Sequence, residues 1–280
     1  MSAEKALYKV LVNKIDQGTL VLPILPEIAL KVRQKAGDPD VSLNQLSQII
    51  THDASLSLDM LKLANSVAFG GTVKIDSVQQ AVSRLGLNTI KSLVTAIAIK
   101  HVFHSNNANI AKYSHRFWIE TIDLASVAIC LLSCYLKEHR QCKLTLDSLT
   151  LVALIQNVGV LPILDEAAQH EKRFAHPKFL SHVIEDLSSE IGMRIVQAWE
   201  LPDEFADIVG NWKDMMFLPN SVEYVDFLRA GAIYCGDITD ELMINLLTVN
   251  YMEKGILPDK KFMQTEDFAS MVSEVKATFI

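Results

Sequence analysis

The sequence has few residues that break regular structure and few that could cross-link it. There are 11 glycines, 8 prolines and 4 cysteines in 280 residues. So little glycine and proline excludes collagen-like and linker-rich architectures. Half of the residues are apolar and 21% are charged. That apolar fraction is sufficient to offset the entropy lost on ordering, so a folded chain is expected.

Positive charge is scarce as well. Lysine and arginine number 26 against 33 aspartates and glutamates, which gives a formal net charge of -7. No cluster of four or more basic residues occurs. Proteins that grip nucleic-acid phosphates or anionic membrane surfaces usually carry such a basic face. The sequence therefore predicts neither nucleic acid nor membrane as a partner.

The cysteines and the apolar runs predict a cytoplasmic protein. Cys130 and Cys134 are four residues apart in an apolar segment, which places both on one helical face as reduced thiols. The N-terminal residues mix charges throughout, without the apolar core of a signal peptide. The longest uncharged run, residues 148–164, contains an amide pair, a glycine and a proline. We interpret that run as a core helix instead of a membrane span.

Helix start signals recur along nearly the whole chain, whereas alternating strand patterns are scarce and Asn-Gly or Asp-Gly hairpin turns are absent. The pattern predicts an all-α fold. The expected capping boxes and single N-caps are Ser42 with Gln45, Ser77 with Gln80, Asp53 and Asn88.

Sequence motifs of catalysis are missing. There is no phosphate-binding Gly-x-x-x-x-Gly-Lys loop, no Gly-x-Gly-x-x-Gly, no Gly-x-Ser-x-Gly and no His-Glu-x-x-His. The one His-Asp dipeptide, at residues 52–53, lies where a helix needs its N-cap, so it is expected to cap the helix and not to bind metal. These residues alone do not indicate an enzyme.

The order of motifs is nevertheless distinctive. Residues 22–70 read LPILPEIALKVRQKAGDPDVSLNQLSQIITHDASLSLDMLKLANSVAFG, and residues 74–94 read KIDSVQQAVSRLGLNTIKSLV. With later landmarks, this order closely resembles the HDOD (HD-related output domain) family over about residues 20 to 235. The landmarks used below are Pro26, Asp53, Asn65, Ser66, Gly86, Trp118, Gly159, Trp199 and Pro202.

The resemblance implies an architecture. HDOD domains are similar to metal-dependent HD phosphohydrolases, whose fold is a helical bundle with a preceding helical lobe. We therefore expect an N-terminal lobe over residues 1–108, an HD-like bundle over residues 109–235 and a C-terminal helical extension over residues 236–280. The polar run at residues 105–109 marks the first boundary.

The resemblance also locates the metal positions. Catalytic HD proteins hold metal with histidine and aspartate side chains. The matching positions here are Glu120, Gln156, Asn157, Ser188, Asn211, Trp212 and Gly231. Glutamine and asparagine keep the volume of the acids without their charge, so metal affinity should be lost while the bundle still packs. Neither metal nor another cofactor is expected.

Glu120 leaves alternatives open. Its carboxylate could hold an ion or transfer a proton, or it could bond Gln156 or Asn157 or lie at the mouth of a hydrated groove. We place Gln156 and Asn157 in mid-helix, and we expect Glu120 or a side-chain amide oxygen to accept the indole N–H of Trp212. The prediction is a small, polar, metal-free cluster of Glu120, Gln156, Asn157 and Trp212, largely closed to substrate-sized ligands.

The function implied by the resemblance is non-catalytic bacterial signal transduction through a protein partner. The alternative is a metal-dependent phosphohydrolase acting on nucleotides or phosphoesters, and a third hypothesis is small-ligand binding in the vacated metal pocket. For Asn65 and Ser66 we predict a structural role, in which both side chains bond backbone groups near the loop through Gly71.

Overall fold

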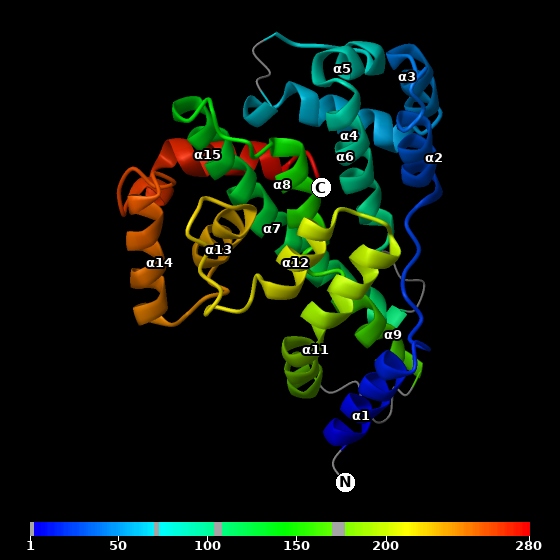
Figure 1. Ribbon diagram of the computed structural model, residues 1–280, viewed down its shortest axis with the longest axis vertical. Helices are drawn as coiled ribbons and strands as arrows, with labels where there is room; N and C mark the ends of the chain where they lie inside the picture. Colours follow the sequence, from blue (N-terminus) through cyan, green and yellow to red (C-terminus); the bar gives the residue numbers. More distant parts are fainter. Residues whose placement is uncertain (1–2, 70–72, 104–107, 170–176) are drawn as a thin grey trace. The chain divides into compact units, whose positions relative to one another are not determined.

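The computed structural model describes residues 3–69, 73–103, 108–169 and 177–280, and within those ranges it is helical without a strand (Figure 1). This confirms the all-α prediction. The first helices are α1 (Ala3–Asp16), α2 (Glu27–Ala36), α3 (Leu43–Thr51), α4 (Ala54–Asn65), η1 (Val67–Phe69), α5 (Val78–Leu85), α6 (Leu87–Ala98) and η2 (Ile99–His101). The remaining helices are α7 (Ala108–Glu138), α8 (Leu146–Ile155), α9 (Val160–Gln169), α11 (Pro177–Ala198), α12 (Asp203–Asn211), α13 (Tyr224–Cys235), α14 (Glu241–Glu253), η3 (Phe262–Gln264) and α15 (Glu266–Lys276).

The helices begin where side chains satisfy free backbone groups. At α3, the Ser42 hydroxyl accepts from the Gln45 N–H at 3.2 Å and the Gln45 side chain accepts from the Ser42 N–H at 3.0 Å, which is the predicted capping box. At α5, Ser77 accepts from the Gln80 N–H, but the Gln80 side chain takes the Asp76 N–H instead. The second box is therefore only half formed.

A glycine explains the one misplaced helix start. The expected cap at Asn88 is wrong, because α6 already begins at Leu87. Gly86 has a φ of 80°, a left-handed conformation that costs glycine little, and it ends α5. The helices on either side of it are bent by 120°, so the chain turns within one residue and α6 needs no polar N-cap of its own.

Contacts divide the chain into two units. The first comprises Met1–Leu25, Ile99–Thr121 and Leu154–Asp214, in which α11 packs against α1, α9 and α12. Its core includes the fully buried aliphatic side chains of Leu7, Leu11, Ile163, Leu164, Ile191, Ile195 and Val209. Helix α7 contributes its N-terminal turns to this unit and the rest of its length to the second.

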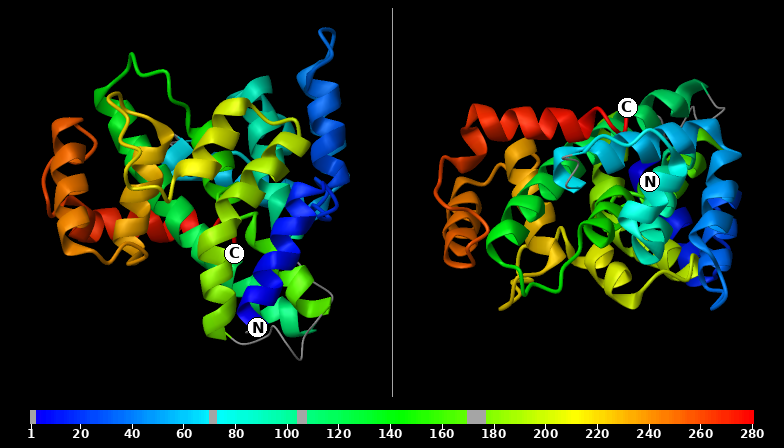
Figure 2. Two further views of the ribbon diagram at one scale, coloured as in Figure 1. Left: turned by 60° about the horizontal axis from the view of Figure 1, so that its bottom comes forward. Right: turned by 90° about the horizontal axis from the view of Figure 1, so that it is seen from above.

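The second unit comprises Pro26–Ala98, Ile122–Ala153 and Met215–Ile280. Helices α2 to α6 pack together, and α15 lies beside η1 (Figure 2). Helix α13 packs against α14, where Lys254 donates to both carboxylate oxygens of Asp226 at 2.9 Å. The three-part division expected from the sequence stays a prediction, and residues 105–107 of its polar break lie outside the described ranges.

Two helical stretches reach the length and hydropathy of a membrane crossing: Ile110–Glu138 and Leu146–Gln169. The bent pair at Gly86 would add a third if it counted as one span. Each of the first two stretches contains an apolar 18-residue window. The structure buries 72% of the window in Ile110–Glu138 and 78% of the window in Leu146–Gln169. Their apolar side chains are therefore used in packing within the protein.

Candidate metal centre

The amide pair at the expected centre of the metal site lies in a turn. Gln156 and Asn157 follow the end of α8 and precede α9, so their predicted mid-helix placement is wrong. Val158 N–H donates to Ile155 O at 2.9 Å and Val160 N–H to Asn157 O at 3.0 Å. Such i to i+3 bonds are typical of a tight turn and break the α-helical register of a run that looks continuous in sequence.

Gly159 allows the turn to pack directly against α11. A Cβ atom on this residue would lie 1.9 Å from the main-chain oxygen of Ser188 and 2.5 Å from the nitrogen of Gly192, both on α11. Only glycine allows the two backbones to approach so closely. A family landmark therefore has a packing role, and it places the Ser188 backbone directly against the turn.

Gln156 is buried but its side chain is not satisfied. It is 2% exposed, and neither its amide nitrogen nor its amide oxygen has a hydrogen-bond partner in the described part of the chain. Its main-chain oxygen accepts from the Trp212 indole N–H at 3.3 Å. The acceptor of the indole N–H is therefore a main-chain oxygen of the turn, and not Glu120 or a side-chain amide as expected.

Asn157 faces α7. Its amide nitrogen lies 3.4 Å from the hydroxyl of Thr121, a long hydrogen bond between two uncharged groups. Thr121 is fully buried and directly follows the first expected metal position. Sequence reasoning missed this residue, although its place next to Glu120 on one helix could have indicated it.

Glu120 pairs with a residue of its own helix. Its carboxylate accepts from Arg116 Nε at 2.7 Å, an i, i+4 ion pair on α7. The side chain of Glu120 is 37% exposed and that of Arg116 72% exposed. The carboxylate raises the pKa of the guanidinium through the hydrogen bond. Glu120 is therefore paired with Arg116, and not with Gln156 or Asn157 as expected.

A cation lies against another of the expected positions. Lys213 donates to the Ser188 hydroxyl at 3.1 Å, and its ammonium is 5.3 Å from the centre of the Trp212 ring. Asn211 donates to the Asp207 carbonyl on α12 at 2.8 Å. Sequence reasoning gave no sign of Lys213, because its place depends on how α12 ends beside α11.

The last expected position has no room for a side chain. Gly231 lies on α13 in the second unit, where a Cβ atom would be 2.8 Å from the Leu124 carbonyl oxygen and 3.2 Å from its Cγ. An aspartate there would force α13 away from α7 and bury a carboxylate against a carbonyl oxygen. The acid of catalytic HD proteins does not fit this packing.

The donor set does not suit a divalent metal. Gln156 and Asn157 offer neutral amides, Glu120 is engaged with Arg116, and Lys213 brings a positive charge to Ser188. Among the described residues, no group of three histidine, cysteine, aspartate or glutamate side chains could hold an ion. Zinc and manganese sites use charged or imidazole donors, so the residues present fit neither.

The landmarks of the first lobe hold backbone in place. Asn65 donates to the Ile75 carbonyl at 2.9 Å and accepts from the Ile75 N–H at 2.8 Å, which bridges the two ends of the segment after α4. The Ser66 hydroxyl donates to Leu63 O at 2.8 Å. Asp53 accepts from the Leu56 N–H at 2.9 Å and so caps α4. Gly71 lies outside the described residues.

The remaining landmarks position helices of both units. Pro26 and Pro202 precede the first residues of α2 and α12, where proline lacks only an N–H that no helix bond needs. The Trp199 indole donates to Pro23 O at 2.8 Å, and the Trp118 ring packs 5.4 Å from that of Phe103. All of these roles are structural.

The fold is all-helical and carries the landmarks of an HD-type bundle, and most of the expected metal positions hold uncharged residues. These features define the class of protein as a helical domain of the HD type that lacks the usual metal donors. The HDOD domain family matches residues 22–215, more than half of the chain. The chain belongs to the HDOD family.

Solved relatives agree with that family. A structure from Shewanella amazonensis SB2B, provisionally described as a metal-dependent phosphohydrolase, is 32% identical, covers 100% of both chains and superposes with a TM-score of 0.94. An HDOD domain protein with unknown function from Geobacter sulfurreducens is 20% identical, with coverages of 98% and 96% and a TM-score of 0.61, and supports the fold.

A protein of Treponema pallidum (strain Nichols) is 25% identical over 191 residues. The match covers 65% of this chain and 36% of the relative, so the chain spans well under two thirds of that protein's length.

Proposed function

We propose that this chain is a non-catalytic signal-transduction module that acts by binding a protein partner in the bacterial cytoplasm. The observation that carries the proposal is the donor set at the HD metal positions. Neutral amides, an ion-paired glutamate and a glycine without room for a side chain replace the histidine and aspartate donors. A domain that keeps the bundle but lacks its metal donors is suited to binding and not to hydrolysis.

One further observation disfavours a nucleic-acid partner, and one relative carries a description related to signalling. The net charge of -7 disfavours a nucleic-acid backbone as the target. A relative from Marinobacter aquaeolei VT8, 19% identical with a TM-score of 0.58, is provisionally described as a signal transduction protein. That likeness concerns the fold, and the role in signalling is the proposal made for this chain.

The alternative is a metal-dependent phosphohydrolase, which is the provisional description of the Shewanella amazonensis relative. A catalytic zinc ion is held by three protein donors, and Mg²⁺ by one or two carboxylates together with waters and substrate phosphates. Here Glu120 is the one carboxylate among the seven positions and is already paired with Arg116, so the alternative would require donors from outside the HD set.

The experiment that separates the two is a hydrolysis assay on the purified full chain. Bis(4-nitrophenyl) phosphate is the substrate, with Mg²⁺, Mn²⁺ or Zn²⁺ added in turn. We expect no release of nitrophenol above the metal-only blank. Metal-dependent release that the Glu120→Gln variant abolishes would establish the alternative. Metal-dependent release that Glu120→Gln leaves unchanged and that co-elutes with the chain on gel filtration would show hydrolysis through donors outside the HD set, and would also contradict the proposal.

A further inference from the structure

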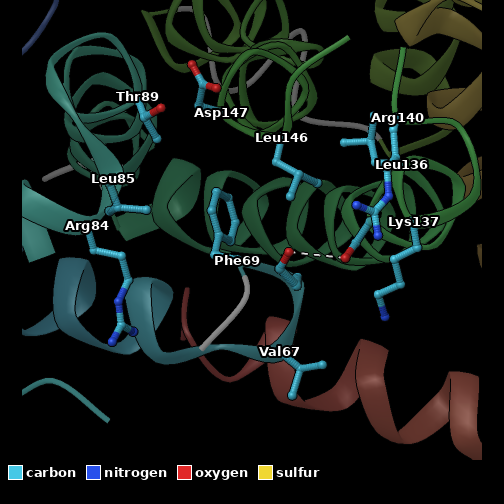
Figure 3. A pocket seen from close by; sticks show the side chains of 12 residues that line it. Val67, Phe69, Arg84, Leu85, Thr89, Leu136, Lys137, Arg140, Leu146 and Asp147 are labelled. Atoms are coloured by element: carbon cyan, nitrogen blue, oxygen red, sulfur yellow. Dashed lines mark hydrogen bonds between the residues drawn. The ribbon is translucent and has the colours of Figure 1, made fainter. Parts of the chain in front are cut away.

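A cavity of about 690 Å³ lies within the second unit, between η1, α5, the C-terminal end of α7 and the start of α8 (Figure 3). None of its lining residues is one of the seven metal positions. Its volume falls in the range of small-molecule sites, which is about 300–1,000 Å³. This cavity therefore has the size of a ligand site and is separate in its residues from the metal positions.

The middle of the cavity is apolar. Three half-buried apolar residues line it: Phe69 of η1, Leu85 of α5 and Leu146 of α8. Each therefore leaves part of its apolar surface exposed to the cavity. The Ser133 hydroxyl donates to the Ala68 carbonyl at 3.1 Å, which fixes η1 to α7 (Figure 3). An aromatic ring with aliphatic neighbours suits a planar apolar group.

Three cations surround this apolar surface. Arg84 comes from α5, Lys137 from α7 and Arg140 from the turn that follows, whereas Asp147 is the one acidic residue of the lining. Figure 3 shows Phe69 and Leu146 between Arg84 on one side and Lys137 and Arg140 on the other. A surplus of positive charge in a chain of net charge -7 favours an anion at this place.

The cations differ in how they are held. Arg84 donates to the Ala64 carbonyl at 3.1 Å and to the Val73 carbonyl, so its guanidinium is fixed by backbone. Lys137 and Arg140 are exposed, and in the described part of the chain neither forms an ion pair or a side-chain hydrogen bond. Their donors are therefore available to a ligand, and no protein carboxylate has to be displaced first.

We propose that this cavity binds a small molecule that carries a phosphate group on a planar apolar body. Arg140 and Lys137 hold the phosphate through charge-assisted hydrogen bonds, and Phe69, Leu85 and Leu146 receive the planar part. The fixed Arg84 adds positive potential from the opposite side. The apolar surface and the three cations are confined to one site of about 690 Å³, which favours a small molecule over an acidic peptide that would need an extended groove.

The test is a titration of the full chain with 1-naphthyl phosphate, followed by calorimetry or by amide chemical shifts. The neutral 1-naphthol and inorganic phosphate serve as the two half-probes. We expect 1-naphthyl phosphate to bind, and each half-probe to bind at least about tenfold more weakly, because each lacks one set of contacts. Raising the salt concentration should weaken binding of 1-naphthyl phosphate and leave 1-naphthol unaffected.

The variant Lys137→Gln/Arg140→Gln should weaken binding of 1-naphthyl phosphate by about tenfold or more. Both residues are exposed, so the fold should be retained. Lys143→Gln is the matched control, since Lys143 is an exposed lysine in the same connection that does not line the cavity, and its affinity should equal that of the unmodified chain.

Three results would overturn the proposal. The first is no binding of 1-naphthyl phosphate at millimolar concentration. The second is binding that Lys143→Gln and the double variant reduce equally, which would indicate general surface attraction. The third is tighter binding of a glutamate hexapeptide than of 1-naphthyl phosphate, which would make the surface a peptide site. None of these results bears on the metal positions, so the proposed function is tested separately.

Discussion

Two regions that carry expected metal positions differ in burial and in the contacts that hold them. One is the turn at residues 156–159, and the other is the face of α7 that carries Glu120. The turn is buried and is fixed by close backbone contact, with Gly159 against α11 and Trp212 bonded to a main-chain oxygen. The face of α7 is half-exposed, and Glu120 is held there by an ion pair within its own helix. Backbone contacts hold the turn in place, whereas the side chain of Glu120 contributes through an exposed ion pair alone.

The largest effect is expected at the turn. Gly159→Ala should destabilise the protein by about 4 kcal/mol or more, because its Cβ would overlap the Ser188 carbonyl and the Gly192 nitrogen. Urea unfolding of the purified chain measures the change. Gly37→Ala is the control, since its Cβ would lie 3.4 Å from Gln34 O, and we expect a change below about 1 kcal/mol. Equal stability of the two variants would contradict the close approach at Gly159.

The second effect extends the comparison to a landmark of the other unit. Asn65→Ala should cost about 2–3 kcal/mol, because it removes two hydrogen bonds and leaves the N–H and C=O of Ile75 to find other partners. Thermal unfolding gives the change. Asn65→Asp is the control, because it keeps the acceptor and loses the donor. Its stability should lie between that of the unmodified chain and that of Asn65→Ala. An unchanged melting temperature of Asn65→Ala together with loss of partner binding would contradict the structural role and indicate direct recognition.

A smaller effect of opposite sign is expected at Gln156. Gln156→Met should be neutral or stabilise the protein by up to about 1 kcal/mol, because an unpartnered buried amide is replaced by an apolar side chain of similar length. Asn157→Leu, which loses the bond to Thr121, should instead destabilise by about 1 kcal/mol. Chemical unfolding of both variants distinguishes the cases. Destabilisation by Gln156→Met would indicate that its amide holds a bonded partner.

The smallest effect is expected on the α7 face. Glu120→Gln should change the free energy of unfolding by less than about 1 kcal/mol, because exposed i, i+4 ion pairs contribute little. Arg116→Gln should match it, and the double variant should equal either single one if the pair is the only interaction lost. A cost of several kcal/mol for Glu120→Gln alone would show that the carboxylate has a buried role.

Much of this arrangement follows from local sequence signals. The caps at Ser42 and Asp53 were predictable because each depends on residues within three positions. The start of α6 was not predictable, because no pattern of polar residues indicates that Gly86 adopts a left-handed conformation. That conformation lets the chain turn within one residue.

The site was harder to predict for the same physical reason. The turn at Gln156 looks like a continuous apolar helix, and only its packing against α11 shows why it breaks. Lys213 reaches Ser188, and Thr121 reaches Asn157, across 25 and 36 residues of sequence. Such partners depend on helix packing, which no local pattern encodes. The cationic cavity likewise gathers residues from η1, α5, α6, α7 and α8 and from the connection after α7.

The most direct test of the central claim is metal binding by the full chain. The protein is incubated with excess Mn²⁺, freed of unbound ion by gel filtration, and analysed for manganese per chain by elemental analysis, with Glu120→Gln in parallel. The account predicts substoichiometric metal that is equal in the two samples, because the remaining donors are neutral or already paired. About one ion per chain, lost in Glu120→Gln, would contradict it and restore the HD positions as a metal centre.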